Sequence, residues 1–199
     1  MNIQISNHLE LAFGAALPAR SAIEGLCKRA DRENIRSIAV PSGSILVAQH
    51  FLDEGSVKIS CRIGFPNGAM DADVKRYETE LAIDAGAHEL ELVPSLAKIA
   101  EGDYSAVLRE IRDVVEAADE RVVKVAIQPE LWEDDVLREV LQVVLDSGAQ
   151  YVCATAADQV RMFRELCGPK FGILAAIDSL ESAGDAIEAG ANIVALAVD

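Results

Sequence analysis

Residues 84–93 read Asp-Ala-Gly-Ala-His-Glu-Leu-Glu-Leu-Val, and the same pattern returns at residues 146–155 and again at residues 188–197. Each copy is the end of a helix, a Gly-Ala turn and a short apolar run typical of a strand. Gly86, Gly148 and Gly190 are expected to adopt the left-handed conformation that ends a helix, because glycine takes it at no steric cost. By our count, each interval between these glycines holds two strand–helix units. A unit that recurs in this way indicates a barrel of eight strands.

The rest of the chain alternates in the same manner. Apolar residues at helical spacing mark residues 23–30, 104–118 and 136–144. An open, doubly wound sheet is the structural alternative, but the chain has no G-x-G-x-x-G or Walker sequence. We therefore predict an α/β fold, a (β/α)8 TIM barrel forming a single domain over residues 1–199. The runs that read as its parallel strands are His8–Phe13, Ile35–Val40, Val57–Ile63, His88–Val93, Val122–Gln128, Tyr151–Thr155, Phe171–Ile177 and Asn192–Val198.

The amino-acid composition argues against some classes of binding partner. With 51% hydrophobic and 26% charged residues, the 199-residue chain can form a large core and a wet surface. The net charge of −15 argues against nucleic acid and anionic membranes as partners. Met1–Ser6 has no signal-peptide pattern, no apolar run approaches the ~18 residues of a membrane span, and the four cysteines include no C-x-x-C pair. We expect a soluble, cytoplasmic protein with reduced thiols, and the sequence leaves a homodimer open.

Strand alternation assigns polar side chains to the barrel interior. In the third strand the apolar set Val57, Ile59, Cys61 and Ile63 faces the helices, which turns Lys58, Ser60 and Arg62 inward. The same argument turns Glu89 and Glu91 inward on the fourth strand, and Lys124, Ala126 and Gln128 on the fifth. The repeat also places Glu91, Cys153 and Ala195 at equivalent positions. Arg62, Glu91 and Lys124 are therefore expected to share one enclosed space.

Two interpretations of these inward charges stay open. Buried charges must be paired, so they form either a satisfied ionic cluster or a reactive site at the carboxyl ends of the strands. In the second interpretation Lys124, desolvated beside Arg62, has a lowered pKa and is a candidate nucleophile toward carbonyls. Cys153 has no histidine on a neighbouring strand and is expected to be a packed core residue more than a nucleophile. The histidines share no ligand spacing, so no metal site is predicted, and no cofactor.

A longer segment carries a family resemblance. Ile63-Gly-Phe-Pro-Asn-Gly-Ala69, a helix with Lys75, and Gly86–Val93 resemble the G-F-P-x-G-A and G-A-D-E-I-D-x-V segments of the deoxyribose-phosphate aldolase family. Leu26-Cys27, Val122–Ile127 and Gly148–Val152 continue the match in the same order. The resemblance implies a (β/α)8 fold and descent from a class I aldolase.

The departures from the family pattern fall on functional positions. The family's sixth strand reads V-K-T-S-T-G and its lysine forms the Schiff base, whereas this chain has Cys153 at that place. The seventh strand's K-x-x-G-G-I-R becomes Phe171–Asp178, without the second lysine, and alanines replace the glycines that hold phosphate. Asp158, Asp178 and Asp199 add negative charge close by. Ordinary cleavage of 2-deoxyribose 5-phosphate is therefore not expected.

The sequence thus supports a divergent lyase, or a related carbonyl-transforming enzyme, acting on a small non-phosphorylated carbonyl substrate. The candidate catalytic residues are Glu91, Lys124 and Cys153, and the candidate binding residues are Arg62, Gln128, Thr155 and Asp178. Two alternatives remain: a catalytically inactive relative that binds a metabolite or a protein partner, and a barrel kept as an oligomeric scaffold.

Overall fold

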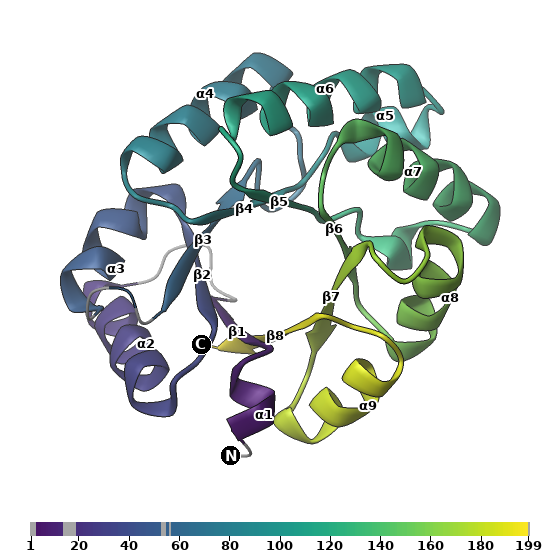
Figure 1. Ribbon diagram of the computed structural model, residues 1–199. Helices are drawn as coiled ribbons and strands as arrows, with labels where there is room; N and C mark the ends of the chain where they lie inside the picture. The colour runs from purple at the N-terminus through teal and green to yellow at the C-terminus, as the bar shows by residue number, and fades with distance from the viewer. Residues whose placement is uncertain (1–2, 14–18, 53–54, 56, 199) are drawn as a thin grey trace.

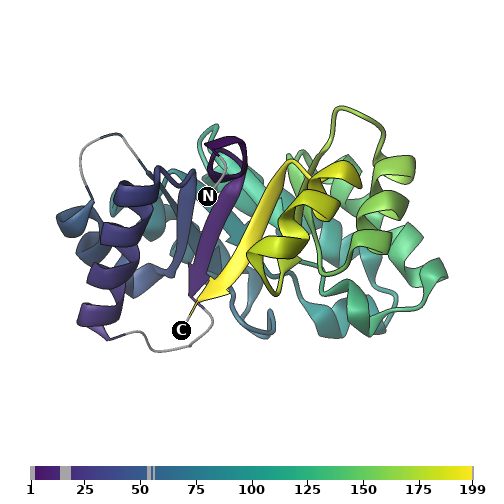
Figure 2. The ribbon, with the colours of Figure 1, turned by 90° about the horizontal axis from the view of Figure 1, so that it is seen from below.

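Parallel strands arranged in sequence order form a closed barrel at the centre of the computed structural model, which describes residues 3–13, 19–52, 55 and 57–198. Within these residues eight strands pair side by side, and β8 closes onto β1 with Leu9 opposite Val194 and Phe13 opposite Val198 (Figures 1 and 2). The strands are β1 (Leu9–Phe13), β2 (Ser37–Pro41), β3 (Lys58–Ile63), β4 (Glu89–Leu92), β5 (Val122–Val125), β6 (Tyr151–Ala154), β7 (Gly172–Ile177) and β8 (Ile193–Val198). The predicted TIM barrel is confirmed, and the open doubly wound sheet is excluded.

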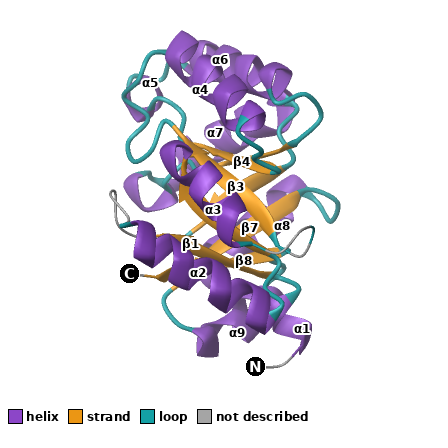
Figure 3. Ribbon diagram, turned by 90° about the vertical axis from the view of Figure 1, so that its left-hand side faces the viewer, coloured by secondary structure: helices purple, strands orange, loops and turns teal. Residues whose placement is uncertain are grey.

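Helices surround the barrel as an outer layer (Figure 3). Asp71 and Asp103 are the N-cap residues of two of them. Each side chain accepts a hydrogen bond from a backbone amide of the first turn, which has no partner within the helix. The helical elements are α1 (Ile3–Ser6), α2 (Arg20–Glu33), η1 (Ser42–Ser44), α3 (Ile45–Phe51), α4 (Ala72–Asp84), α5 (Leu96–Ala100), α6 (Tyr104–Ala117), η2 (Pro129–Leu131), α7 (Asp134–Ser147), α8 (Ala157–Cys167), η3 (Leu180–Ser182) and α9 (Ala183–Glu188).

The repeated glycine turns adopt the predicted backbone. Gly86, Gly148 and Gly190 have φ values of 98°, 90° and 115°. Two strands lie between consecutive members of this set, β4 and β5 in the first interval and β6 and β7 in the second. Each glycine therefore ends the helix that precedes an even-numbered strand, as the sequence repeat indicates.

Most of the core lies between the strands and the helices. The outward set of each strand packs there, including Ile59, Leu90, Leu92 and Val125, and all are buried. A second, smaller apolar cluster of Cys153, Leu174, Ile193 and Ala195 fills one side of the barrel interior. The predicted strand phasing is confirmed. No helix in the described part of the chain has the length and hydrophobicity that crossing a bilayer would require.

Candidate active site

Inward side chains stack in levels along the barrel axis, because a closed eight-stranded barrel staggers its strands by about one residue each. Following the strand register in this way puts Glu10, Ser60, Lys124 and Leu174 at one level. The next level toward the carboxyl ends holds Ala39, Glu91, Cys153 and Ala195, and the one above it holds Ala12, Arg62, Ala126 and Ala176. Residues that share the inward direction therefore differ in height.

A group of closely paired charges occupies the lower part of the barrel, and we call Glu10, Arg36, Lys58, Glu89 and Lys124 the ionic floor. Lys124 Nζ lies 2.6 Å from Glu10 Oε2 and 3.4 Å from Glu89 Oε2. Glu89 also accepts hydrogen bonds of 3.0 and 2.5 Å from the two terminal nitrogens of Arg36 and one of 3.1 Å from Lys58. Glu10 accepts a further hydrogen bond of 2.8 Å from the Ser37 hydroxyl.

The ionic floor fixes the charges of its members. Burial opposes the charged form of Lys124, but the carboxylates of Glu10, Glu89 and Glu91 outweigh it and raise the pKa of the amine. Burial likewise opposes ionisation of Glu89, yet Arg36, Lys124 and Lys58 lower the pKa of that carboxyl to about 2. Lys124 and Glu89 are therefore ionised across the neutral range. The lowered pKa expected for Lys124 is wrong because two carboxylates contact its amine.

A pocket opens above the ionic floor, at the carboxyl ends of the strands. Its volume is about 180 Å³. The polar side chains along it are Arg62, Glu91, Gln128, Cys153 and Thr155, and the rest of the lining is apolar, chiefly Phe65, Pro66, Val93, Leu174 and alanines. A small, mostly apolar cavity with a few convergent polar groups is the usual form of a ligand site.

Arg62 and Glu91 form the charged pair of the pocket. The Nε atom of Arg62 lies 3.4 Å from Glu91 Oε1, while its Nη1 donates a 2.7 Å hydrogen bond to the carbonyl of Phe13. The guanidinium also stacks 4.7 Å from the centre of the Phe65 ring. Within the described residues the buried Nε–H has no hydrogen-bond acceptor of good geometry. The Arg62–Glu91 pair therefore leaves hydrogen-bonding capacity of the guanidinium unused.

Cys153 lies beside this pair. Its side chain is buried, and burial raises the pKa of the thiol well above the usual value, with the Glu91 and Glu10 carboxylates acting in the same direction. The thiol is therefore protonated at neutral pH and is a weak nucleophile. In the pocket the Cys153 side chain therefore shapes the wall and offers a weak S–H hydrogen-bond donor.

The rim of the pocket is polar and partly acidic. Gln128, whose φ is 49°, donates a 2.7 Å hydrogen bond to the carbonyl of Pro66 across the mouth. The Thr155 hydroxyl lies 3.0 Å from Gln159 Oε1 and 3.2 Å from Glu130 Oε2. A carboxylate is thus held at the mouth next to an exposed hydroxyl.

A buried ion pair outside the barrel holds one wall of the pocket. Lys75 Nζ on α4 donates a 2.7 Å hydrogen bond to the carbonyl of Gly68 and lies 2.5 Å from Glu110 Oε1 on α6. Glu110 in turn accepts a 3.1 Å hydrogen bond from the amide of Ser95. A Cβ atom at Gly68 would lie 1.9 Å from the carbonyl oxygen of Pro94, so the two loops that follow β3 and β4 interlock. The β3–α4 loop, which supplies Phe65 and Pro66, is thereby fixed.

The structure brings together five of the seven residues proposed from sequence. Arg62, Glu91, Gln128, Cys153 and Thr155 line the pocket, whereas Lys124 belongs to the ionic floor and exposed Asp178 lies outside the lining. Sequence reasoning missed Glu10, the buried partner of Lys124, although its place between Leu9 and Leu11 gives the alternation that would have identified it. It also missed the apolar wall formed by Phe65 and Pro66.

No lysine lines the pocket. The six lysines of the chain are all among the described residues, and none is in the lining. Lys28 pairs with Glu24 on α2, and Lys58, Lys75 and Lys124 are committed to the ion pairs above. Lys98 lies on α5 and Lys170 precedes β7. Among the described residues no group of three or more histidine, cysteine or acidic side chains is placed to hold a metal ion.

The chain is similar to known aldolases. The deoxyribose-phosphate aldolase of Streptococcus uberis is 34% identical over 200 residues, covering 95% of this chain and 90% of that protein. The solved structure of the deoxyribose phosphate aldolase from Aeropyrum pernix superposes with a TM-score of 0.88 and 25% identity, covering 97% of this chain and 86% of that one. An aldolase designated QR15 has the same fold, with a TM-score of 0.92 at 22% identity over 98% of this chain and 91% of its own. No protein-family model matches the chain.

Proposed function

The chain belongs to the deoxyribose-phosphate aldolase family, and we propose that within it this protein transforms a small, non-phosphorylated carbonyl compound by proton transfer, without an imine. The observation that carries the proposal is the content of the pocket. A guanidinium and a carboxylate meet there at 3.4 Å, and no lysine lines the cavity. An imine needs a primary amine within reach of the carbonyl, and a protonated thiol does not replace it.

The position of Cys153 supports the loss of imine chemistry. The family resemblance puts the Schiff-base lysine at this place, and Cys153 lies in the pocket lining beside Glu91 and Arg62. Lys124 comes within one level of the pocket, but its amine is fully buried and contacts two carboxylates. A charged amine held in that way is an electrostatic support and not a nucleophile.

The Arg62–Glu91 pair suits the cleavage or formation of a β-hydroxy carbonyl compound. The Glu91 carboxylate accepts the proton of the β-hydroxyl group as the adjacent carbon–carbon bond breaks. The electron pair of that bond moves onto the substrate carbonyl and gives an enolate, whose oxygen accepts a hydrogen bond from the guanidinium of Arg62, which lines the pocket. Protonated Glu91 then returns its proton to the enolate carbon, so that proton and electrons balance.

The charge of the mouth favours a substrate without phosphate. Glu130 is held against Thr155 at the rim, and Asp158 and Asp178 are exposed after β6 and β7. A phosphate dianion within several ångströms of these carboxylates would be repelled. The pocket of about 180 Å³ is also smaller than most ligand pockets, so it suits a small ligand.

Proton exchange tests the proposal without knowledge of the full substrate. We expect the protein to catalyse exchange of α-carbon hydrogens of small aldehydes or ketones in D₂O, observed by proton NMR. Glu91→Gln should abolish the exchange, and Cys153→Ser should retain it. Borohydride treatment in the presence of the same carbonyls should leave the intact mass of the wild-type protein unchanged.

Two outcomes would contradict the proposal. A borohydride-stable adduct mapped to any lysine would show imine chemistry. Ligand binding by the wild type, detected by calorimetry, without any exchange would favour the metabolite-binding module that the sequence leaves open.

A further inference from the structure

Three oxygen acceptors from three different segments meet at the mouth of the pocket. The Thr155 hydroxyl, which lines the pocket, lies 3.2 Å from Glu130 Oε2 and 3.0 Å from Gln159 Oε1. Thr155 directly follows β6, Glu130 belongs to η2 after β5, and Gln159 lies in the first turn of α8. We call these three side chains the mouth cluster.

The mouth cluster is short of hydrogen-bond donors. A hydroxyl group has a single hydrogen, whereas both atoms that face the Thr155 hydroxyl are acceptors. The orientation of the Gln159 amide is fixed by the backbone N–H of Thr155, which donates a 2.9 Å hydrogen bond to Gln159 Oε1. The hydroxyl therefore donates to Glu130 or to Gln159 at any moment, but not to both.

The protein supplies no cation to Glu130 within the part of the chain that the structure describes. Arg62 is the one cationic side chain in the described lining of the pocket, and it pairs with Glu91 instead. The N-terminus of α8, which would otherwise attract an anion, is occupied by Asp158, whose Oδ1 accepts a 2.9 Å hydrogen bond from the amide of Gln159. The mouth thus carries negative charge that a cationic ligand would neutralise.

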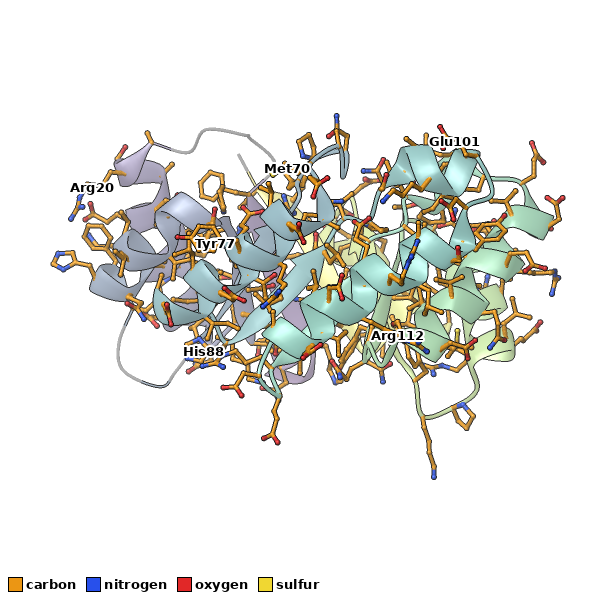
Figure 4. All side chains as sticks on the ribbon, turned by 90° about the horizontal axis from the view of Figure 1, so that it is seen from above. Arg20, Met70, Tyr77, His88, Glu101 and Arg112 are labelled. Atoms are coloured by element: carbon orange, nitrogen blue, oxygen red, sulfur yellow. The ribbon has the colours of Figure 1, made fainter. Side chains whose placement is uncertain are left out.

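The mouth cluster lies above the reactive pair of the pocket. Figure 4 shows the barrel side-on, with Glu101 of a carboxyl-end loop along the upper edge and His88, which precedes β4, along the lower edge. Cys153 and Thr155 both line the pocket, and two residues of extended chain separate them by about 7 Å. Glu91 lies at the level of Cys153. A ligand whose carbonyl group is beside Glu91 therefore reaches the mouth cluster with its other end after a few bonds.

We propose that the mouth cluster is a subsite for a protonated amine, and that the substrate is a short aldehyde or ketone that carries an amino group. An ammonium group brings three N–H donors to three acceptor oxygens, and its charge is opposite to that of Glu130. The proposal rests on the carbonyl chemistry proposed above, because it takes the carbonyl group to lie beside Arg62 and Glu91. The mouth cluster then selects the substrate, and Glu91 transforms it.

Three ketones that differ only at one end give the first test. They are 4-amino-2-butanone, 2-pentanone and 4-oxopentanoate, which end in a cation, a methyl group and a carboxylate. The exchange of their α-hydrogens in D₂O is followed by proton NMR, and each catalysed rate is divided by the rate without protein, which removes differences in intrinsic acidity. The amino ketone should be the best substrate and 4-oxopentanoate the poorest.

Variants of Glu130 give the second test. Glu130→Gln keeps the size of the side chain and removes its charge, which weakens the contact with the amine and relieves the repulsion of the carboxylate. The ratio of the two exchange rates, amino ketone to 4-oxopentanoate, should therefore fall at least about tenfold. Glu165→Gln is the matched control: Glu165 is also exposed but lies in the second half of α8, and the ratio should not change.

Moving the charge within the mouth cluster separates substrate selection from a structural role of Glu130. In the Glu130→Gln background, Gln159→Glu returns a carboxylate to the cluster from a different helix and keeps the acceptor for the Thr155 amide. The preference for the amino ketone should recover. A carboxylate at position 159 would not replace a structural contact of Glu130.

The outcomes distinguish this proposal from the carbonyl chemistry on which it rests. Equal normalised rates for the three ketones, a ratio insensitive to Glu130→Gln, or no recovery with Gln159→Glu overturns the amine subsite and leaves the chemistry in place. If no ketone exchanges, the chemistry is overturned, and calorimetric affinities for the same three ketones and variants decide the amine subsite. Equal affinities, or no binding of the amino ketone, overturn it.

Discussion

Glu89 and Glu91 lie two residues apart on β4, both pointing into the barrel, and they have opposite surroundings. Glu89 is surrounded by Arg36, Lys58 and Lys124, with contacts between 2.5 and 3.4 Å. Within the part of the chain that the structure describes, Glu91 has one ion pair, at 3.4 Å to Arg62, and it faces a mostly apolar cavity. Two neighbouring inward positions of one strand therefore hold a carboxylate with three cationic partners and a carboxylate to which we assign a ligand.

This difference shows why inward charge alone does not identify an active site. Removing charge from water is unfavourable unless good partners replace the water, and the ionic floor supplies them almost completely. The pocket above the floor supplies fewer partners to its charged groups, so part of the hydrogen-bonding capacity of Arg62 and Glu91 is unused. Sparse pairing, more than burial, distinguishes the two regions.

The largest expected effect comes from breaking the floor. Lys124→Met removes the cation between Glu10 and Glu89 and leaves two buried carboxylates close together, so the free energy of unfolding should fall by about 3–5 kcal/mol. Urea denaturation at neutral pH measures it. Lys58→Met is the matched control: Lys58 also contacts Glu89, but its side chain is 54% exposed, and the loss should be no more than about 1 kcal/mol. Equal losses would contradict the assignment of the floor's stability to its buried contacts.

The same substitution at the two positions of β4 should separate stability from chemistry. Glu91→Gln should reduce α-hydrogen exchange at least about 100-fold, because the amide is no base, while changing the free energy of unfolding by less than about 1 kcal/mol. Glu89→Gln should show the reverse pattern, a clear loss of stability and little loss of exchange in the protein that remains folded. Hydrogen exchange measured by NMR and urea denaturation should be compared for both variants. If the two variants behave identically, Glu89 and Glu91 do not have the different roles assigned to them.

Acid should weaken the floor through protonation of Glu89. The folded-state pKa of Glu89 is lowered from 4.5 to about 2, so its stabilising effect is complete above its unfolded value and is lost as the pH falls toward 2. Over that range this carboxyl alone should remove roughly 3 kcal/mol from the free energy of unfolding. Denaturation series at several acidic pH values should show a shallower decline for Glu89→Gln than for the wild type. Parallel declines would argue that other carboxyls carry the acid sensitivity.

The smallest expected effect is that of a lysine at position 153 on the turnover of 2-deoxyribose 5-phosphate. Cys153→Lys should give a borohydride-trapped adduct with acetaldehyde at position 153, since the side chain lines the pocket. Cleavage of 2-deoxyribose 5-phosphate should stay at background, because the mouth is acidic and phosphate binding energy is missing. Robust cleavage by this variant, followed as acetaldehyde release, would show that the mouth matters less than the charge arrangement implies.

The barrel, the phasing of its strands and the glycine turns were predictable because each depends on a local pattern. Alternation on β3, β4 and β5 correctly separated Leu90 and Leu92 from Glu89 and Glu91. Height along the axis was not predictable in the same way, since it depends on the stagger of the whole closed sheet. For that reason Lys124 was grouped with Arg62 and Glu91, although it lies below them against Glu10. Asp178 likewise follows the right strand but is exposed outside the cavity.

The ionic floor also limits the depth of the pocket. A pocket that ends on paired, fully buried charges does not deepen when a longer molecule enters, because separating Lys124 from Glu10 is unfavourable without water to replace either partner. Its walls are different: Ala126, Ala176, Ala195 and Leu174 are small or apolar side chains that single substitutions can enlarge or reduce. We therefore expect the pocket to tolerate little change in the length of a ligand along the barrel axis. Substitutions in its walls should change the width of ligand that it accepts, and related proteins should differ in this width.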